Sequence, residues 1–233
     1  TMPLTTALLY QDDNFVGREY HRALAQAGRA PALVAAVGRI RPESIEREIA
    51  RTGGRWNPPA IPADVRVHRF ERLDDPTLPA LLGTRGVDLA IQGGLGILKP
   101  EVLDAPRIGF VNVHPGRLPA YRGNSCPEWA LLEGKPVVAT AHLIDAGIDT
   151  GPVICAREMV LDTGWAYEDF RAHLYGHCAN VLIEAIERLE REGPACATPQ
   201  SEEGACYRDP MPDEEMAQVR ALFAGHAAAR TAR

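Results

Sequence analysis

The sequence predicts an α/β fold in which helices cover both faces of a mostly parallel sheet. Short apolar runs alternate with amphipathic stretches along the chain, and this alternation is typical of parallel sheets built from strand–helix–strand units. Two later apolar runs lead into polar residues, which is where open α/β sheets bind ligands. A chain of 233 residues with 45% hydrophobic side chains is sufficient for one well-buried core.

The first half of the chain carries the clearest alternation. Apolar runs predict strands at 5–10, 31–37, 65–70 and 87–92. Helices are predicted between these strands at 15–27, 42–51 and 78–82. In the first helix Val16, Tyr20 and Leu24 share one face, and Gly28 is suited to end it. Pro42 favours a helix start, because its missing N–H is not needed in the first turn.

The second half adds strands at 108–113 and 137–144, which are expected to run parallel as neighbours. Residues 163–192 predict one long helix that Gly193 ends, with an apolar stripe formed by Phe170, Leu174, Cys178, Leu182 and Ile186. We therefore expect a single domain over residues 1–193. Residues 194–233 are expected to form a short polar tail with a helix at 213–223, not a separate domain.

Composition and charge exclude several classes of protein. The formal net charge is −6, and basic residues are scattered among acidic ones, so nucleic acid and anionic membranes are not expected partners. No apolar run approaches the length of a membrane span, and the first ten residues lack the pattern of a signal peptide. The five cysteines form no CxxC pair, which favours reduced thiols and a cytoplasmic location. No metal site is expected.

Polar side chains interrupt the apolar run that begins at Ile108. Asn112 and His114 stand two residues apart, so a strand turns both to the same face. Pro115 then ends the strand, because proline cannot donate to the ladder. The second apolar run leads into the acidic segment 145–151. We expect an amide, an imidazole and a carboxylate to converge where these strands end.

This stretch closely resembles the folate-dependent formyltransferase family. Residues 112–115 match that family's Asn-x-His-Pro, residues 118–123 match Leu-Pro-x-Tyr-Arg-Gly, and residues 145–151 match Asp-x-Gly-x-Asp-Thr-Gly. The resemblance extends from about Gly86 to Ile154 and is weak over the first 60 residues. It implies a Rossmann-like catalytic domain, 10-formyltetrahydrofolate as the formyl donor, and three catalytic residues, Asn112, His114 and Asp149.

Formyl transfer to an amine suits these three side chains. The Asn112 amide can donate to the oxygen on which negative charge develops. His114 can move protons near neutral pH, and Asp149 can orient the imidazole, stabilise its charged form or hold a relay water. The alternative for Asn112 and His114 is a satisfied buried polar pair. For Asp149 the alternative is a purely structural role, because Asp-Thr-Gly is also a common turn sequence.

The resemblance also assigns the residues that bind folate and acceptor. Small and aliphatic residues suit a flat ring held partly by backbone groups, and the folate pocket is expected from Leu95, Gly96, Ile97, Leu98, Ile144, Asp145, Ala146, Gly147 and Ile148. The acceptor is expected beside Tyr121, Arg122 and Gly123. Arg122 would pair with a substrate anion or, nearly as readily, with a surface carboxylate. His142 fits support of the site and the core equally well, and Cys126 fits a small buried side chain better than a nucleophile.

The acceptor amine is the least determined part of the prediction. Residues 194–233 are acidic, and they are shorter than the second domain with which methionyl-tRNA formyltransferases grip tRNA. Both features argue against tRNA as the acceptor. Asp12 and Asp13 stand where glycinamide ribonucleotide transformylases hold a phosphate, which they would repel. The Tyr-Arg-Gly turn followed by residues 129–134 resembles sugar N-formyltransferases, so the predicted acceptor is a nucleotide-linked amino sugar. An amino acid or secondary-metabolite amine stays open as the acceptor, and after it the activity of a glycinamide ribonucleotide transformylase. A homodimer also stays open, and an inactive folate-binding module is the non-enzyme alternative.

Overall fold

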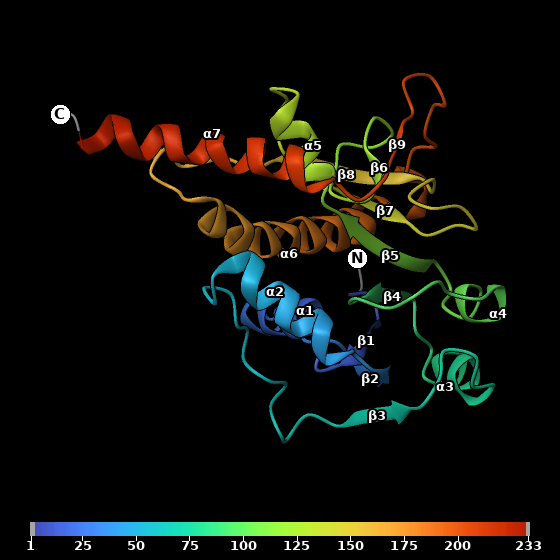
Figure 1. Cartoon of the computed structure of the whole chain (residues 1–233). Coiled ribbons are helices and arrows are strands. Elements are labelled where there is room, and N and C mark those ends of the chain that lie inside the picture. The colour runs from blue at the N-terminus through green and yellow to red at the C-terminus, as the bar shows by residue number, and fades with distance from the viewer. Residues whose placement is uncertain (1–2, 232–233) are drawn as a thin grey trace.

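A seven-stranded sheet in the order β3-β2-β1-β4-β5-β7-β8 forms the centre of the protein (Figure 1). The computed structural model describes residues 3–231, with the backbone alone for residues 225–231. The first five strands run parallel, so the predicted mostly parallel sheet is confirmed. The strands are β1 (Thr6–Asp12), β2 (Leu33–Arg39), β3 (Val67–Phe70), β4 (Leu89–Gln92), β5 (Gly109–His114), β7 (Val138–Leu143) and β8 (Val153–Glu158).

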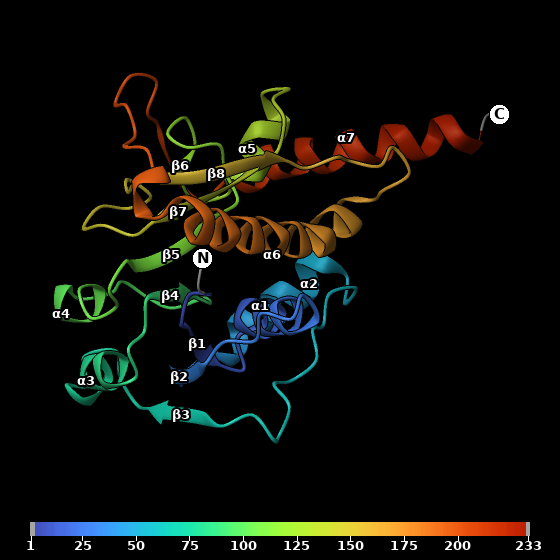
Figure 2. The same ribbon diagram turned by 180° about the vertical axis from the view of Figure 1, so that it is seen from behind.

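Helices cover both faces of the sheet, as predicted (Figures 1 and 2). In β1, Leu8 and Tyr10 belong to the core shared with α1 and α6, whereas Ala7 and Leu9 belong to the core shared with α3 and α4. Successive strand side chains point to opposite faces, and this separates the two cores. The helices are α1 (Phe15–Gln26), α2 (Pro42–Thr52), α3 (Thr77–Thr84), α4 (Pro100–Leu103), α5 (Cys126–Leu132), α6 (Tyr167–Glu192) and α7 (Asp213–Thr231), with a 3-10 turn at Pro194–Cys196.

One strand direction differs from the sequence prediction. The run 137–144 forms β7, but β7 is antiparallel to β5, with Asn112 opposite His142 and His114 opposite Thr140. A parallel neighbour would need a crossover back to the start of β5, and the connection through α5 instead stays at the end where β5 finishes. The loop after β7 therefore starts beside Phe110, where the Ile144 amide donates to the Phe110 carbonyl, and must fold back to reach His114.

The residues after Gly193 pack against the domain. A short strand β9 (Tyr207–Arg208) pairs in parallel with β6 (Arg122–Gly123). Helix α7 is longer than predicted, and its Phe223 ring lies 5.5 Å from the ring of Phe170. The ends of the two predicted ranges, residues 1–2 and 232–233, lie outside the described residues, and the domain division stays a prediction. No helix in residues 3–231 combines the length and apolar character that a membrane crossing requires.

Candidate active site

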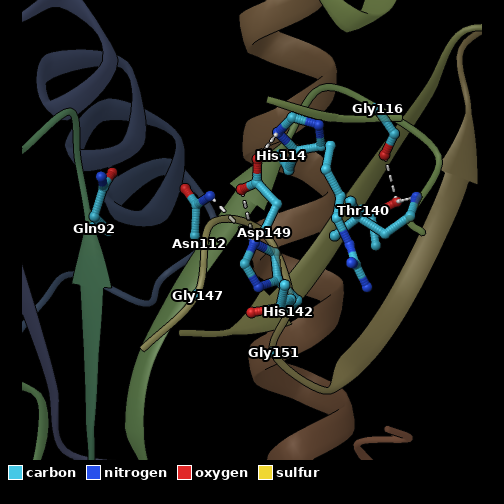
Figure 3. A network of polar contacts seen from close by, with 12 residues as sticks. Gln92, Asn112, His114, Gly116, Thr140, His142, Gly147, Asp149 and Gly151 are labelled. Atoms are coloured by element: carbon cyan, nitrogen blue, oxygen red, sulfur yellow. Dashed lines mark hydrogen bonds and ion pairs between the residues drawn. The ribbon is translucent and has the colours of Figure 1, made fainter. Parts of the chain in front are cut away.

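Asn112 and His114 project from β5 toward the loop after β7, where Asp149 lies (Figure 3). The Asn112 Nδ2 atom is 3.3 Å from His142 Nε2 on the neighbouring strand. His114 Nδ1 is 3.3 Å from Asp149 Oδ2, and His142 Nε2 is 3.6 Å from Asp149 Oδ1. The structure thus brings together the three residues that the sequence singled out, and adds His142 to them.

The loop that carries Asp149 is shaped by its glycines and by Asp145. A Cβ at Gly151 would overlap the Leu143 carbonyl oxygen, so only glycine lets the chain fold back over β7. Asp145 Oδ1 accepts from the Gly147 amide at 3.0 Å and from the Thr150 hydroxyl at 2.5 Å. Asp149 itself has a left-handed backbone, with φ of 56°, a conformation that Asp adopts more readily than most residues. The motif Asp-x-Gly-x-Asp-Thr-Gly therefore encodes a turn that aims the second carboxylate inward.

Hydrogen bonding assigns the protons of His114. Its Nε2 lies 2.7 Å from the Tyr121 carbonyl oxygen, which can only accept, so Nε2 carries a proton. Glycine at position 116 allows the imidazole to reach this carbonyl oxygen, because a Cβ there would collide with the ring. The remaining nitrogen, Nδ1, faces the Asp149 carboxylate. Nδ1 is therefore the atom that gains or loses a proton.

The charges of His114 and Asp149 respond to burial and to each other. Burial lowers the pKa of His114, and the Asp149 carboxylate and the Tyr121 carbonyl offset only part of that effect. Burial alone would raise the pKa of Asp149. The contact with the His142 ring, the facing His114 imidazole and the Gly123 amide outweigh burial, so the Asp149 pKa is lowered. A neutral imidazole beside an ionised carboxylate is the state expected of a proton acceptor.

His142 holds Asn112 in place. Its Nδ1 lies 2.9 Å from the Leu143 carbonyl oxygen and therefore donates to it. In the neutral ring Nε2 is then an acceptor, which receives one N–H of the Asn112 amide. The second N–H of that amide remains for a developing oxyanion. The sequence left His142 between support of the site and the core; the structure places it in the site.

A cavity of about 310 Å³ opens beside Asn112 and Asp149. It is lined by both predicted folate-binding segments, so all nine residues lie together, although their contact with folate stays a prediction. Ile97 and Ile148 are 87% and 54% exposed at its rim, where a flat ligand would cover them. Gln92, which the sequence reading missed, also lines it and accepts from the Gly94 amide at 3.0 Å. Its signal was a polar residue ending the apolar run 87–92.

The Tyr-Arg-Gly turn makes its polar contacts within the protein, and its contact with the acceptor stays a prediction. The Tyr121 hydroxyl donates to Glu133 at 2.6 Å. Arg122 is buried, and its guanidinium donates to Gln200 and Glu202. Of the two partners expected for Arg122, the structure shows the surface carboxylate, because its donors contact Gln200 and Glu202 of the C-terminal segment, and pairing with a substrate anion stays a prediction. Gly123 contributes its amide, which donates to Asp149 Oδ2 at 3.0 Å.

A second cavity of about 290 Å³ shares Leu95 with the first and lies at the ends of β1 and β2. Three aromatic residues line it: Phe15, Trp56 and Tyr175. The Trp56 and Tyr175 rings are stacked, with centroids 3.9 Å apart. Arg47 also lines this cavity, and in the described part of the chain no hydrogen bond or ion pair engages its guanidinium. The sequence reading missed these residues, because they come from separate elements.

The acidic loop after β1 is neutralised in the structure. Asp12 pairs with Arg69 of β3, and Asp13 pairs with Arg39 of β2 at 3.2 Å. The repulsion of a phosphate that the sequence reading expected from these carboxylates is therefore offset by two arginines from neighbouring strands. Among residues 3–224, whose side chains the structure describes, no group of three or more His, Cys, Asp or Glu is arranged to hold a metal ion.

Comparisons with known proteins agree on one family. A family model described as formyl transferase matches residues 35–186. Methionyl-tRNA formyltransferase from Deinococcus radiodurans is 36% identical over 130 residues, which are 55% of this chain and 40% of that protein. The chain thus spans well under half the length of that relative.

Solved structures share the fold. Glycinamide ribonucleotide transformylase 1 from Symbiobacterium toebii is 26% identical with a TM-score of 0.57, over 82% of this chain and 89% of that one. The formyltransferase PseJ from Anoxybacillus kamchatkensis is 21% identical with a TM-score of 0.53, over 95% and 99% of the two chains. The PseJ structure contains a UDP-linked formamido sugar and tetrahydrofolate.

Proposed function

Because this chain belongs to the formyl transferase family, we propose that it transfers the formyl group of 10-formyltetrahydrofolate to the amine of a small molecule. One observation carries the proposal: Asn112, His142, Asp149 and His114 form a connected polar cluster, at the wall of a cavity with an apolar rim. The cavity fits the donor, since small and aliphatic loops on two sides suit a flat ring.

Each side chain of the cluster has a step to perform. When bound, 10-formyltetrahydrofolate supplies the formyl carbon and retains the nitrogen that this carbon leaves. The second N–H of Asn112, at the wall of the cavity, would be available to the formyl oxygen and would stabilise the negative charge that develops there as the amine attacks. The proton lost by the amine passes to His114 Nδ1, beside Asp149 Oδ2. Asp149 stabilises the resulting imidazolium, and the same proton is then available for the departing folate nitrogen.

The test of activity is a mass-spectrometric assay with 10-formyltetrahydrofolate and a panel of amines. We expect one acceptor to gain one formyl group, with release of tetrahydrofolate. The His114→Ala protein serves as the negative control. If the wild-type protein binds a 10-formyltetrahydrofolate analogue but formylates no amine in the panel, the inactive folate-binding module replaces this proposal.

For the acceptor we favour a nucleotide-linked amino sugar. The second cavity supports this choice, because it offers aromatic rings for a base and the unpaired Arg47 guanidinium for a phosphate. The pairing of Asp12 and Asp13 with arginines removes the main objection. The ligand in the PseJ structure is of the same chemical class.

Methionyl-tRNA is the second candidate, because the relative that matches at 36% identity carries that activity in its name. Net charge of −6 opposes it. Three acceptors discriminate the possibilities: a UDP-linked 4-amino sugar, the same sugar without its nucleotide, and initiator methionyl-tRNA. Formylation of the UDP-linked sugar alone supports the proposal. Formylation of the sugar without its nucleotide favours a metabolite amine, and formylation of the tRNA favours the second candidate.

A further inference from the structure

The turn at Asp149 is held by a side chain that comes from outside it. The Gln200 amide nitrogen donates to the Asp149 carbonyl oxygen at 2.9 Å and to the Gly151 carbonyl oxygen at 2.7 Å. One amide group therefore ties both ends of the turn that Figure 3 shows between these residues. Asp149 has a left-handed backbone, which a non-glycine residue keeps only when its surroundings hold it.

Gln200 is itself fixed on its other side. Its Oε1 accepts from Arg122 Nε at 3.3 Å and from Arg122 Nη2 at 3.0 Å. The backbone next to it forms a bridge with β8, in which Val153 and Thr198 exchange hydrogen bonds of 2.8 Å. The Gln200 oxygen faces only donors and its nitrogen faces only carbonyl oxygens, so the orientation of its amide is determined.

Residues 198–208, which contain Gln200 and β9, also position the Gly123 backbone amide, which binds the Asp149 carboxylate. Gly123 donates to Asp149 Oδ2, and it lies in β6, which pairs with β9 (Figure 1). The Asn124 backbone N–H donates to the Arg208 carbonyl oxygen at 2.8 Å. A Cβ at Gly123 would overlap that carbonyl oxygen. Both the backbone and the carboxylate of Asp149 are thus fixed through residues 198–208.

We propose that Gln200 is a positioning residue for Asp149, and that residues 198–208 complete the active site. This segment lies beyond residues 35–186, which the family model matches. Arg122 contributes to the same positioning. Its guanidinium donates to Gln200 Oε1, and the Gln200 amide nitrogen donates to the two carbonyl oxygens of the turn. The expected fall in kcat rests on the proposed formyl transfer, whereas the expected change in the His114 pKa does not.

The first variant is Gln200→Glu. It keeps the size of the side chain and its contact with Arg122, but it turns a carboxylate oxygen toward two carbonyl oxygens. Gln200→Ala removes both contacts. The matched control is Glu203→Ala, because Glu203 is exposed on the same segment. We expect kcat to fall about 10- to 100-fold in both Gln200 variants, with the KM for folate within about twofold, since Gln200 is bonded to Asp149 and Gly151 and to none of the nine residues predicted to bind folate.

The pH dependence separates positioning from a loss of folding. His114 faces Asp149, His142 and the Tyr121 carbonyl. Of these, Asp149 and the carbonyl raise the His114 pKa and His142 lowers it. A displaced Asp149 should lower the His114 pKa, so the acidic limb of the kcat/KM profile should move to lower pH. In contrast, unfolding would reduce the amplitude of the profile without moving it.

NMR titration of the His114 ring provides a readout that needs no activity. We expect a lower pKa in Gln200→Ala, which adds no charge near His114, than in the wild-type protein, and no change in Glu203→Ala. If formyl transfer itself is absent from the wild-type protein, this titration still decides the positioning role. An unchanged His114 titration in the folded Gln200→Ala protein would overturn the inference.

Discussion

At the scale of single residues, His114 has the clearest role to test. His114→Ala removes the Nδ1 atom that faces Asp149, and turnover should fall by ~10²–10⁴-fold because general base catalysis is lost. Steady-state kinetics at saturating folate measure this, with His173→Ala as the control because His173 is exposed on α6. Near-normal turnover would mean that His142, whose Nε2 is 3.6 Å from Asp149 Oδ1, carries the proton instead.

Arg47 provides the residue-scale test of the acceptor. Arg47→Ala removes the unpaired guanidinium from the second cavity, so the KM for a nucleotide-linked amino sugar should rise about 10-fold, the loss of a charged hydrogen bond. The KM for folate should not change. Arg41→Ala is the matched control, since Arg41 is exposed six residues earlier, at the N-cap of α2, and does not line the cavity. Equal effects of the two substitutions would show that net charge, not a specific contact, is responsible.

At the scale of elements, the loop after β7 is the sensitive part. Gly151→Ala would drive a Cβ into the Leu143 carbonyl, so the loop must shift, at about 1–3 kcal/mol of stability, and carry Asp149 away from His114. Both urea denaturation and turnover should report the change. Gly83→Ala in α3 is the control, because a Cβ there meets nothing within 4 Å and should stabilise the helix by roughly 0.5–1 kcal/mol. Full activity of the Gly151 variant would contradict the fold-back geometry.

At the scale of the whole molecule, buried histidines predict how stability depends on pH. Burial lowers the pKa of His21 and of His114, so below about pH 6.5, the usual histidine value, the unfolded chain binds more protons than the folded one. The free energy of unfolding should therefore fall as the pH falls from 7.5 to 5.5. Urea denaturation across this range measures the slope, and His21→Gln should make it shallower. A flat profile in the wild-type protein would contradict the burial of both rings.

The sequence by itself determined six of the seven strands of the main sheet, all but β8, and the three residues that the structure brings together in the candidate site. The alternation in β1 separates Leu8 from Leu9 by face, and the two-residue spacing places Asn112 and His114 together. These features are local, because the periods of strands and helices depend only on neighbouring residues. The same holds for the glycines of segment 145–151, whose spacing already indicates a tight turn.

Only the tertiary structure decided which groups are free to act. It made β7 antiparallel to β5 and bonded the Arg122 guanidinium to Gln200. It also paired Asp12 and Asp13 with arginines, and it left Arg47 in a cavity without a partner among the described residues. Each of these outcomes depends on contacts between residues far apart in the chain, such as Arg122 with Gln200. A side chain's availability is set by the partners that folding brings to it, and no local pattern records those partners.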